Sequence, residues 1–307
     1  MQEKLYYNMN IIETYNLSKS YNGVSALNGV SFGVEQGELY GLIGPDGAGK
    51  TTLFRLLATL LNPDSGSGVV NGYDIVKDYQ KIRSCIGYMP GRFSLYPDLS
   101  VEENLNFFAA LFGVDIKESY NLITPIYKHI EPFKSRRAGK LSGGMKQKLA
   151  LSCALIHKPA ILLLDEPTTG VDAVSRSEFW DMLSQLKESG ITTLVSTPYM
   201  DEALRCDRIA LCNEGCILGI DTPARITAEF NSKLYSISAN NMYALLNAAR
   251  KIEGVIECYP FGEKHHLVAG NSFKPEIFIS QLSDIEGVTI EPAEPTIEDM
   301  FIKLMRQ

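Results

Sequence analysis

A glycine-rich run in the first fifth of the chain has the residue types and spacing of a phosphate-binding loop. Residues 44–52 read Gly-Pro-Asp-Gly-Ala-Gly-Lys-Thr-Thr and fit the pattern G-x-x-x-x-G-K-[ST]. The glycines allow a tight turn in which successive backbone N–H groups point at phosphate oxygens. Lys50 offers a mobile positive charge to the β- and γ-phosphates, and the Thr51 hydroxyl suits Mg²⁺. We therefore predict that ATP is bound by Gly44, Pro45, Asp46, Gly47, Ala48, Gly49, Lys50, Thr51 and Thr52.

The segments on either side of this loop support the same interpretation. Residues 38–43 have the pattern of a buried strand, and residues 52–61 that of a helix. The partial positive charge of the helix N-terminus therefore faces the anion. A glycine-rich turn that merely contains a lysine is the alternative, and the strand–loop–helix order disfavours it. The loop alone identifies a nucleotide-binding protein and nothing narrower.

Two adjacent carboxylates follow a second apolar run. Residues 161–164 read Ile-Leu-Leu-Leu, as expected of a strand that is buried on both faces of a parallel sheet, and Asp165 and Glu166 come directly after them. Ligands of open α/β sheets bind at this carboxyl end. Asp165 is the candidate Mg²⁺ partner together with Thr51, and Glu166 is placed to polarise a water for attack on the γ-phosphate. A solvated acidic strand end is the weaker alternative beside a phosphate loop.

A third motif narrows the interpretation to one superfamily. Residues 141–145 read Leu-Ser-Gly-Gly-Met at the start of a predicted helix. With the two earlier motifs in this order, residues 10–230 resemble the ATP-binding cassette (ABC) ATPases, whose corresponding run is Leu-Ser-Gly-Gly-Gln. The resemblance implies that two cassettes close head to tail, so that Ser142, Gly143 and Gly144 contact the ATP of the opposite cassette. It also implies that Tyr21 stacks on adenine, although an ordinary strand-end aromatic is the alternative.

Two positions depart from the family pattern. Gly91 stands where the family has a glutamine that touches the metal and the attacking water, and Pro198 stands where it has a switch histidine. Neither glycine nor proline supplies a side chain for these tasks. The phosphate-binding parts are complete, whereas parts that support hydrolysis at the chain's own site are missing. This combination of retained phosphate-binding residues and missing hydrolytic residues fits one half of an asymmetric cassette pair. A homodimer with two slow sites is the alternative.

No other histidine or cysteine is a clear replacement or a metal ligand. We predict that His129, His157, His265 and His266 are surface or capping residues. The six cysteines lack ligand-like spacing and are expected to be reduced, so we predict no zinc.

Composition agrees with one large domain and a small one. The chain has 307 residues, 45% of them hydrophobic, and a net charge of −7 that provides no general attraction to nucleic acid. No run approaches the about 18 apolar residues of a spanning helix, and residues 1–8 lack the apolar core of a signal peptide. We therefore expect the protein at the cytoplasmic face of the inner or plasma membrane, bound through a permease.

The sequence pattern also predicts the fold. We expect an α/β P-loop NTPase core of the ABC type with an antiparallel β subdomain and a helical lobe at about 91–154. Residues 231–307 are predicted to form a small C-terminal α+β domain with the ferredoxin-like order βαββαβ. Residues 101–112 carry a wide apolar face, which is either lobe core or, with Phe93 and Tyr96, part of a groove for a helix of a transmembrane subunit.

The function that these features favour is the ATP-binding subunit of an ABC transporter. Residues 294–301 resemble the ending of drug- and polysaccharide-exporter ATPases, which points to export. The expected partners are a transmembrane permease and a second cassette, in a homodimer or a heterodimer, and no nucleic acid. The alternatives are a soluble ABC-type ATPase that acts on ribosomes or DNA, and a nucleotide-binding regulator that scarcely hydrolyses ATP.

Overall fold

The computed structural model describes residues 10–306. The prediction that residues 1–8 are not a signal peptide lies outside this range. The chain divides into two compact units, one up to Pro223 and one from Ala224 onward. The predicted boundary at residue 230 stays a prediction, and each unit is described by itself.

A six-stranded sheet forms the centre of the first unit, with the strand order β10-β9-β3-β8-β7-β6. The five strands β9, β3, β8, β7 and β6 run parallel to one another, and β10 is antiparallel to β9. Every residue of β3, β7 and β8 is buried, because layers cover both faces of the sheet. The strands are β3 (Leu39–Ile43), β6 (Ile86–Met89), β7 (Ile161–Asp165), β8 (Thr192–Thr197), β9 (Arg208–Asn213) and β10 (Cys216–Asp221).

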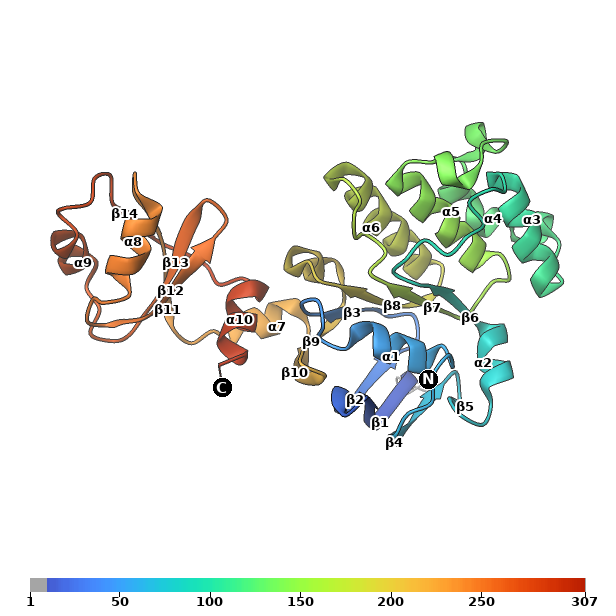
Figure 1. The fold of residues 1–307 in the computed structure, drawn as a ribbon, viewed down its shortest axis with the longest axis horizontal. Coiled ribbons are helices and arrows are strands. Elements are labelled where there is room, and N and C mark those ends of the chain that lie inside the picture. The colour runs from blue at the N-terminus through green and yellow to red at the C-terminus, as the bar shows by residue number, and fades with distance from the viewer. Residues whose placement is uncertain (1–9, 307) are drawn as a thin grey trace, which may run out of the picture. The chain divides into compact units, whose positions relative to one another are not determined.

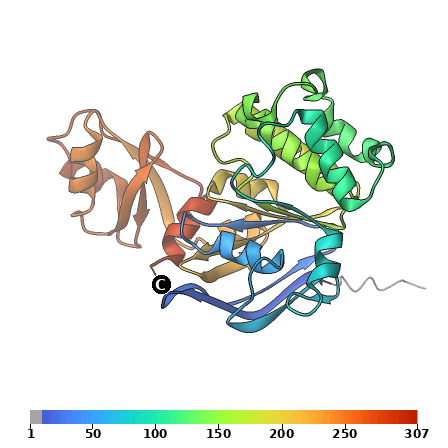
Figure 2. The same cartoon turned by 45° about the vertical axis from the view of Figure 1, so that its right-hand side comes forward.

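An antiparallel sheet with the order β2-β1-β4-β5 lies on one side of this centre (Figures 1 and 2). Its strands are β1 (Asn10–Tyr21), β2 (Val24–Glu35), β4 (Ser65–Val70) and β5 (Tyr73–Asp74). Helix α1 (Lys50–Leu57) lies between the two sheets and buries Leu53, Phe54, Leu56 and Leu57. The predicted antiparallel subdomain is confirmed.

Helices cover the other face of the central sheet (Figures 1 and 2). They are α3 (Val101–Phe112), α4 (Ile116–Tyr127), α5 (Gly143–Leu155) and α6 (Ala173–Glu188). A capping box between Ser100 and Glu103 begins α3, and Gly113 in the left-handed region ends it. The remaining elements of this part are α2 (Tyr79–Cys85) and the 3₁₀ turns η1 (Glu131–Phe133), η2 (Ala138–Lys140) and η3 (Met200–Arg205).

The second unit contains an antiparallel sheet of order β12-β13-β11-β14 with helices α8 and α9 packed against it. The chain order is β11 (Lys233–Ser238), α8 (Met242–Ala249), β12 (Val255–Phe261), β13 (Lys264–Ala269), α9 (Pro275–Gln281), β14 (Thr289–Pro292) and α10 (Ile297–Leu304). The short helix α7 (Pro223–Ala228) precedes them. A C-terminal α+β fold is confirmed, and the ferredoxin-like assignment of this segment stays a prediction.

The prediction that all four histidines are surface or capping residues is wrong. Only His129 is exposed. His157 is half-buried and stacks on Phe112, with ring centroids 3.8 Å apart, and burial lowers its pKa. His265 and His266 are 6% and 5% exposed. These neighbours in β13 face opposite sides of the sheet, and both are buried because α8 covers one side and α10 the other.

Candidate nucleotide site

Residues 46–52 of the phosphate-binding motif line a cavity of about 470 Å³ at the carboxyl ends of β3 and β7, whereas Gly44 and Pro45 contact it only through Lys50. Its lining comprises Tyr21, Ala26, Asp46, Gly47, Ala48, Gly49, Lys50, Thr51, Thr52 and Glu166. Tyr21 is 41% exposed at the edge of this cavity, where its ring is open to a planar ligand. The cavity thus unites residues from three separate stretches of the sequence.

The loop has a conformation that only glycine tolerates at several positions. Gly47 and Gly49 have φ angles of 83° and 93°, in the left-handed region. A Cβ on Gly44 would lie 2.2 Å from the carbonyl oxygen of Cys212, and one on Gly49 would lie 2.4 Å from that of Ala26. The backbone therefore packs against β9 and β2 so closely that side chains are excluded, which leaves the loop amides to bind an anion.

Lys50 is held inside the loop by three oxygen atoms. Its Nζ donates to the carbonyl oxygens of Gly44 and Pro45 at 2.8 and 2.9 Å, and it lies 3.0 Å from Glu166 Oε1. The Lys50 side chain is 3% exposed. The ammonium group is thus oriented in advance toward the cavity, where phosphate oxygens can replace the carboxylate.

Asp165 and Thr51 form a pair suited to a magnesium ion. The Thr51 hydroxyl donates to Asp165 Oδ1 at 3.2 Å, and the Ser196 hydroxyl donates to the same oxygen at 2.8 Å. Asp165 is 1% exposed, and this burial raises its pKa against the opposite effect of the two hydroxyl groups. A carboxylate and a hydroxyl next to a phosphate loop are oxygen ligands of the kind that Mg²⁺ uses, so the residues fit the ion.

Glu166 occupies a backbone conformation that is rare for residues other than glycine. Its φ is 49°, and its N–H donates to both the carbonyl oxygen and the hydroxyl of Ser196, at 3.1 and 2.9 Å. Such strain costs about 1–3 kcal/mol and persists only where surrounding contacts enforce it. The bonds to Ser196 therefore hold the Glu166 backbone in this conformation, in which its carboxylate meets Lys50. Sequence reasoning did not identify Ser196, because its position at the end of β8 has no motif of its own.

The Leu-Ser-Gly-Gly run is not part of this cavity. Ser142 caps α5 through Met145 N at 3.4 Å, and both Ser142 and Gly143 are exposed. Gly144 is buried, and a Cβ there would lie 2.7 Å from Ser175 Oγ. The run therefore presents an exposed helix start that can serve a second molecule.

The two departures from the family pattern border the site. A Cβ on Gly91 would lie 3.1 Å from the Asp165 carbonyl oxygen and 3.8 Å from Asp165 Oδ2. Pro198 follows Thr197, whose carbonyl oxygen accepts from the N–H of Gly44 at 3.3 Å. Both positions are thus within side-chain reach of the nucleotide site, and neither supplies a polar side chain.

Comparison with known proteins places the chain in a family. Residues 27–169 match the family model described as ABC transporter. The Nod factor export ATP-binding protein I of Burkholderia orbicola is 34% identical over 302 residues, which cover 95% of this chain and 96% of that protein. The chain belongs to the ABC transporter family. The ABC assignment made from the three motifs is confirmed.

Two further similarities concern chain length and fold. The probable multidrug ABC transporter ATP-binding protein YbhF of Escherichia coli K12 is 38% identical over 301 residues. The match covers 96% of this chain and 52% of YbhF, so the chain spans about half the length of this ABC relative. A solved ABC cassette, described as dimeric in a post-hydrolysis state with ADP and Pi, is 26% identical. It covers 69% of this chain and 98% of the cassette, with a TM-score of 0.62. Within residues 10–306, no helix has the length and apolar character needed to cross a membrane.

Proposed function

We propose that this ABC ATPase binds Mg-ATP in the cavity around Lys50 and powers an exporter through a separate permease. The convergence of Lys50, Thr51 and Glu166 in one cavity, with Asp165 bonded to the Thr51 hydroxyl, carries this proposal. The relative named for Nod factor export supports export as the direction of transport. Equilibrium binding of Mg-ATP and single-turnover hydrolysis test it, and a chain that binds no ATP would contradict it.

The residues of the site suggest how hydrolysis proceeds. The loop amides and Lys50 bind the β- and γ-phosphates, and Lys50 leaves its ion pair with Glu166 as they arrive. Thr51 and Asp165 would hold Mg²⁺, which neutralises charge on the phosphates when bound. The freed Glu166 carboxylate then accepts a proton from the attacking water, whose oxygen bonds to the γ-phosphorus as the bond between that phosphorus and the bridging oxygen breaks and ADP leaves.

We propose that a second cassette completes the site. The support is the exposed start of α5 at Ser142 and Gly143, together with the dimeric state of the solved relative. The partner's ATP would lie against these two residues and Gly144. Because Gly91 and Pro198 affect only the chain's own site, we further propose an asymmetric pair in which this chain completes the active site of a more active cassette.

Mixing this chain with a co-encoded cassette separates an asymmetric pair from a symmetric one. In an asymmetric pair, Ser142→Arg in this chain should remove most ATPase activity, while Lys50→Ala should reduce it far less. Ser135→Arg, at another exposed serine, is the matched control and should leave activity unchanged. Equal losses from Ser142→Arg and Lys50→Ala would contradict the asymmetric pair and support a homodimer.

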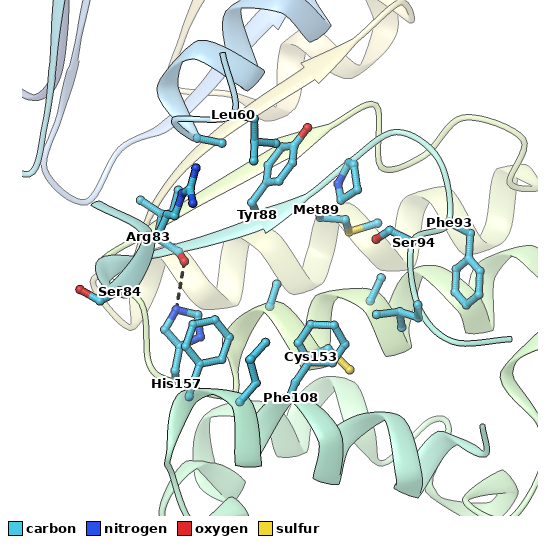
Figure 3. A pocket seen from close by; sticks show the side chains of 18 of the residues that line it. Leu60, Arg83, Ser84, Tyr88, Met89, Phe93, Ser94, Phe108, Cys153 and His157 are labelled. Carbon is cyan, nitrogen blue, oxygen red and sulfur yellow. Dashed lines mark hydrogen bonds between the residues drawn. The ribbon is translucent and has the colours of Figure 1, made fainter. Parts of the chain in front are cut away.

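An apolar pocket of about 660 Å³ is the proposed attachment point for the permease (Figure 3). It lies between the end of β6 and helices α3 and α5. Its lining includes Leu60, Tyr88, Met89, Phe93, Phe108, Leu111, Phe112 and His157. The prediction that Phe93 and part of α3 line a groove agrees with this lining. Tyr96 does not line it, because its ring packs edge-on against Phe107 at 4.7 Å.

Leu111→Arg tests the permease proposal. Leu111 is 63% exposed, so the substitution adds charge to the pocket without disturbing the core. The variant should bind ATP as the parent does and lose co-purification with the membrane subunit. Val76→Arg, at an exposed residue outside the pocket, is the control. Co-purification of the Leu111→Arg protein at the parent level would contradict the proposal.

The missing side chains at Gly91 and Pro198 favour one alternative, a nucleotide-binding regulator with little hydrolysis. Tight ATP binding with no measurable single turnover, alone or with a second cassette, would support the regulator. The third possibility, an ATPase that acts on ribosomes or DNA, would be supported by co-purification with nucleic acid in place of a membrane subunit.

A further inference from the structure

A buried carboxylate that no family motif identified lies behind the nucleotide site. Glu202 belongs to η3 and is 4% exposed. One of its oxygen atoms, Oε2, accepts hydrogen bonds from the hydroxyl groups of Thr168 at 3.0 Å and Thr197 at 2.5 Å. Both threonines are also buried, at 1% and 0% exposure. The three side chains form one closed cluster behind the loops that carry the site.

Each threonine belongs to a different loop of the site. Thr168 comes two residues after Glu166, in the turn that the bond from Val171 N to Thr168 O closes at 3.3 Å. Thr197 ends β8 and precedes Pro198, and its hydroxyl also accepts from Tyr199 N at 3.1 Å. Its carbonyl oxygen accepts from Gly44 N at the start of the phosphate loop. The Glu202 carboxylate thus connects the turn after Glu166 to the strand end that supports the phosphate loop.

The buried Glu202 carboxylate has few partners for a group whose role is only structural. Glu202 Oε1 accepts no hydrogen bond from residues 10–306, and Arg176 Nη1 lies 4.0 Å from it. Burial of a carboxylate with so few partners opposes folding, and well-packed apolar residues often replace such groups without loss of stability. What an apolar residue cannot do is accept two hydroxyl bonds from two loops. This geometry points to alignment of the loops as the role of the side chain.

We propose that Glu202 is a positioning residue for ATP hydrolysis. Its carboxylate holds the turn after Glu166 at a fixed distance from the end of β8, and thereby fixes the direction of the Glu166 carboxylate relative to the γ-phosphate. Glu202 contacts the loops from behind and does not line the cavity, so it affects the reaction and not the affinity for ATP. The inference rests on the proposed function, because it presumes hydrolysis at Glu166.

Glu202→Ala removes both hydroxyl bonds and is the first test. We expect the maximal hydrolysis rate to fall about 10- to 100-fold, since misplacement of a catalytic group by about 1 Å has effects of this size. The Kd for Mg-ATP should stay within about threefold of the parent value, because the loop amides and Lys50 remain. Glu202→Gln should recover most of the rate, because its amide oxygen can accept both hydroxyl bonds.

A double-mutant cycle with Thr168→Val tests whether the effect runs through this bond. Thr168→Val alone should slow hydrolysis, and adding it to Glu202→Ala should slow hydrolysis no further, because the contact is already absent. Multiplying effects of the two substitutions would contradict the inference. Thr168→Val also keeps the inference testable if Glu202→Ala does not fold.

Glu38→Ala is the matched control for loss of a buried carboxylate. Glu38 is 7% exposed, accepts from Glu35 N at 2.8 Å, and lies at the opposite end of β3 from the nucleotide site. It should lower thermal stability and leave the hydrolysis rate unchanged. A rate loss in Glu38→Ala equal to that in Glu202→Ala would assign the effect to stability and overturn the inference. An unchanged hydrolysis rate in Glu202→Ala would also overturn the inference. If Glu202→Ala leaves the rate unchanged while Glu166→Gln abolishes hydrolysis, the positioning role of Glu202 is wrong and the proposed function remains supported.

Discussion

Lys50 and Glu166, which are far apart in sequence, form an ion pair with Nζ and Oε1 3.0 Å apart. In the proposed mechanism each group has a different task once ATP is bound: the ammonium binds phosphate and the carboxylate activates water. In the free site the two groups satisfy each other. ATP binding must therefore separate them, which couples the arrival of the phosphates to the release of the catalytic carboxylate.

Glu166→Gln should abolish hydrolysis and strengthen ATP binding. The amide cannot accept the proton of the attacking water, so the rate should fall by at least about 100-fold. The negative charge that competes for Lys50 and repels the γ-phosphate is also removed, so ATP affinity should rise by roughly 3- to 10-fold. Titration with Mg-ATP and single-turnover assays measure both effects. Glu188→Gln, at an exposed residue near the end of α6, is the control, and unchanged hydrolysis in Glu166→Gln would remove this residue from the catalytic role.

Lys50→Ala should abolish tight Mg-ATP binding. The phosphates lose the only side-chain cation in the loop, and charge-assisted contacts of this kind are among the strongest in a binding site. Isothermal titration of Mg-ATP measures the loss, with Lys77→Ala at an exposed lysine as the control. An affinity within a few-fold of the parent would show that the phosphate site is wrongly assigned.

Gly91→Gln combined with Pro198→His should raise the hydrolysis rate at the chain's own site by at least about tenfold, because one well-placed acid–base or charge-stabilising group contributes about 10²–10⁴-fold. A side chain at position 91 begins 3.1 Å from the Asp165 carbonyl oxygen, so the loop must shift by a few tenths of an ångström to accept it. Gly91→Ala separates this steric effect from the effect of the amide. A rate equal to that of the parent would mean that other residues already perform both tasks.

Asp299 should make the attachment of α10 dependent on pH. Burial alone would raise the pKa of Asp299, but hydrogen bonds from His266, Tyr259 and Thr296 outweigh it and lower the pKa. A carboxylate whose folded pKa is lowered stabilises the fold above its ordinary value of about 3.9, and this stabilisation is lost as the pH falls through the folded pKa. The protection factors of the α10 amides against hydrogen exchange in the full chain should therefore fall below about pH 4.

Asp299→Asn tests the source of this dependence. The substitution should lower the free energy of opening of α10 by about 1–3 kcal/mol at pH 7 and make it less dependent on pH in the acid range. Asp284→Asn, at an exposed residue of the same unit, is the control. An identical pH profile in Asp299→Asn and the parent would show that another group governs the attachment.

Consecutive residues determined the parts of this protein that depend on local conformation and burial. The turn of residues 44–49 requires glycine at positions with left-handed φ, so its pattern could be recognised without the structure. The apolar run of β7 and the carboxylates after it indicate a strand end in the same way. The ABC family, the two-sheet core and the C-terminal α+β fold followed from such signals in their order along the chain.

Strand order and packing decided the rest. Glu202 meets Thr168 and Thr197 only because β7 and β8 are neighbours in the sheet and η3 turns back beneath their ends. His265 and His266 are buried because separate helices cover the two faces of β13, which the strand's own residues do not reveal. Phe93 reaches the apolar pocket, whereas Tyr96 packs against Phe107. Contacts of this kind join residues that are distant in sequence, and their energy depends on a three-dimensional arrangement that no local pattern encodes.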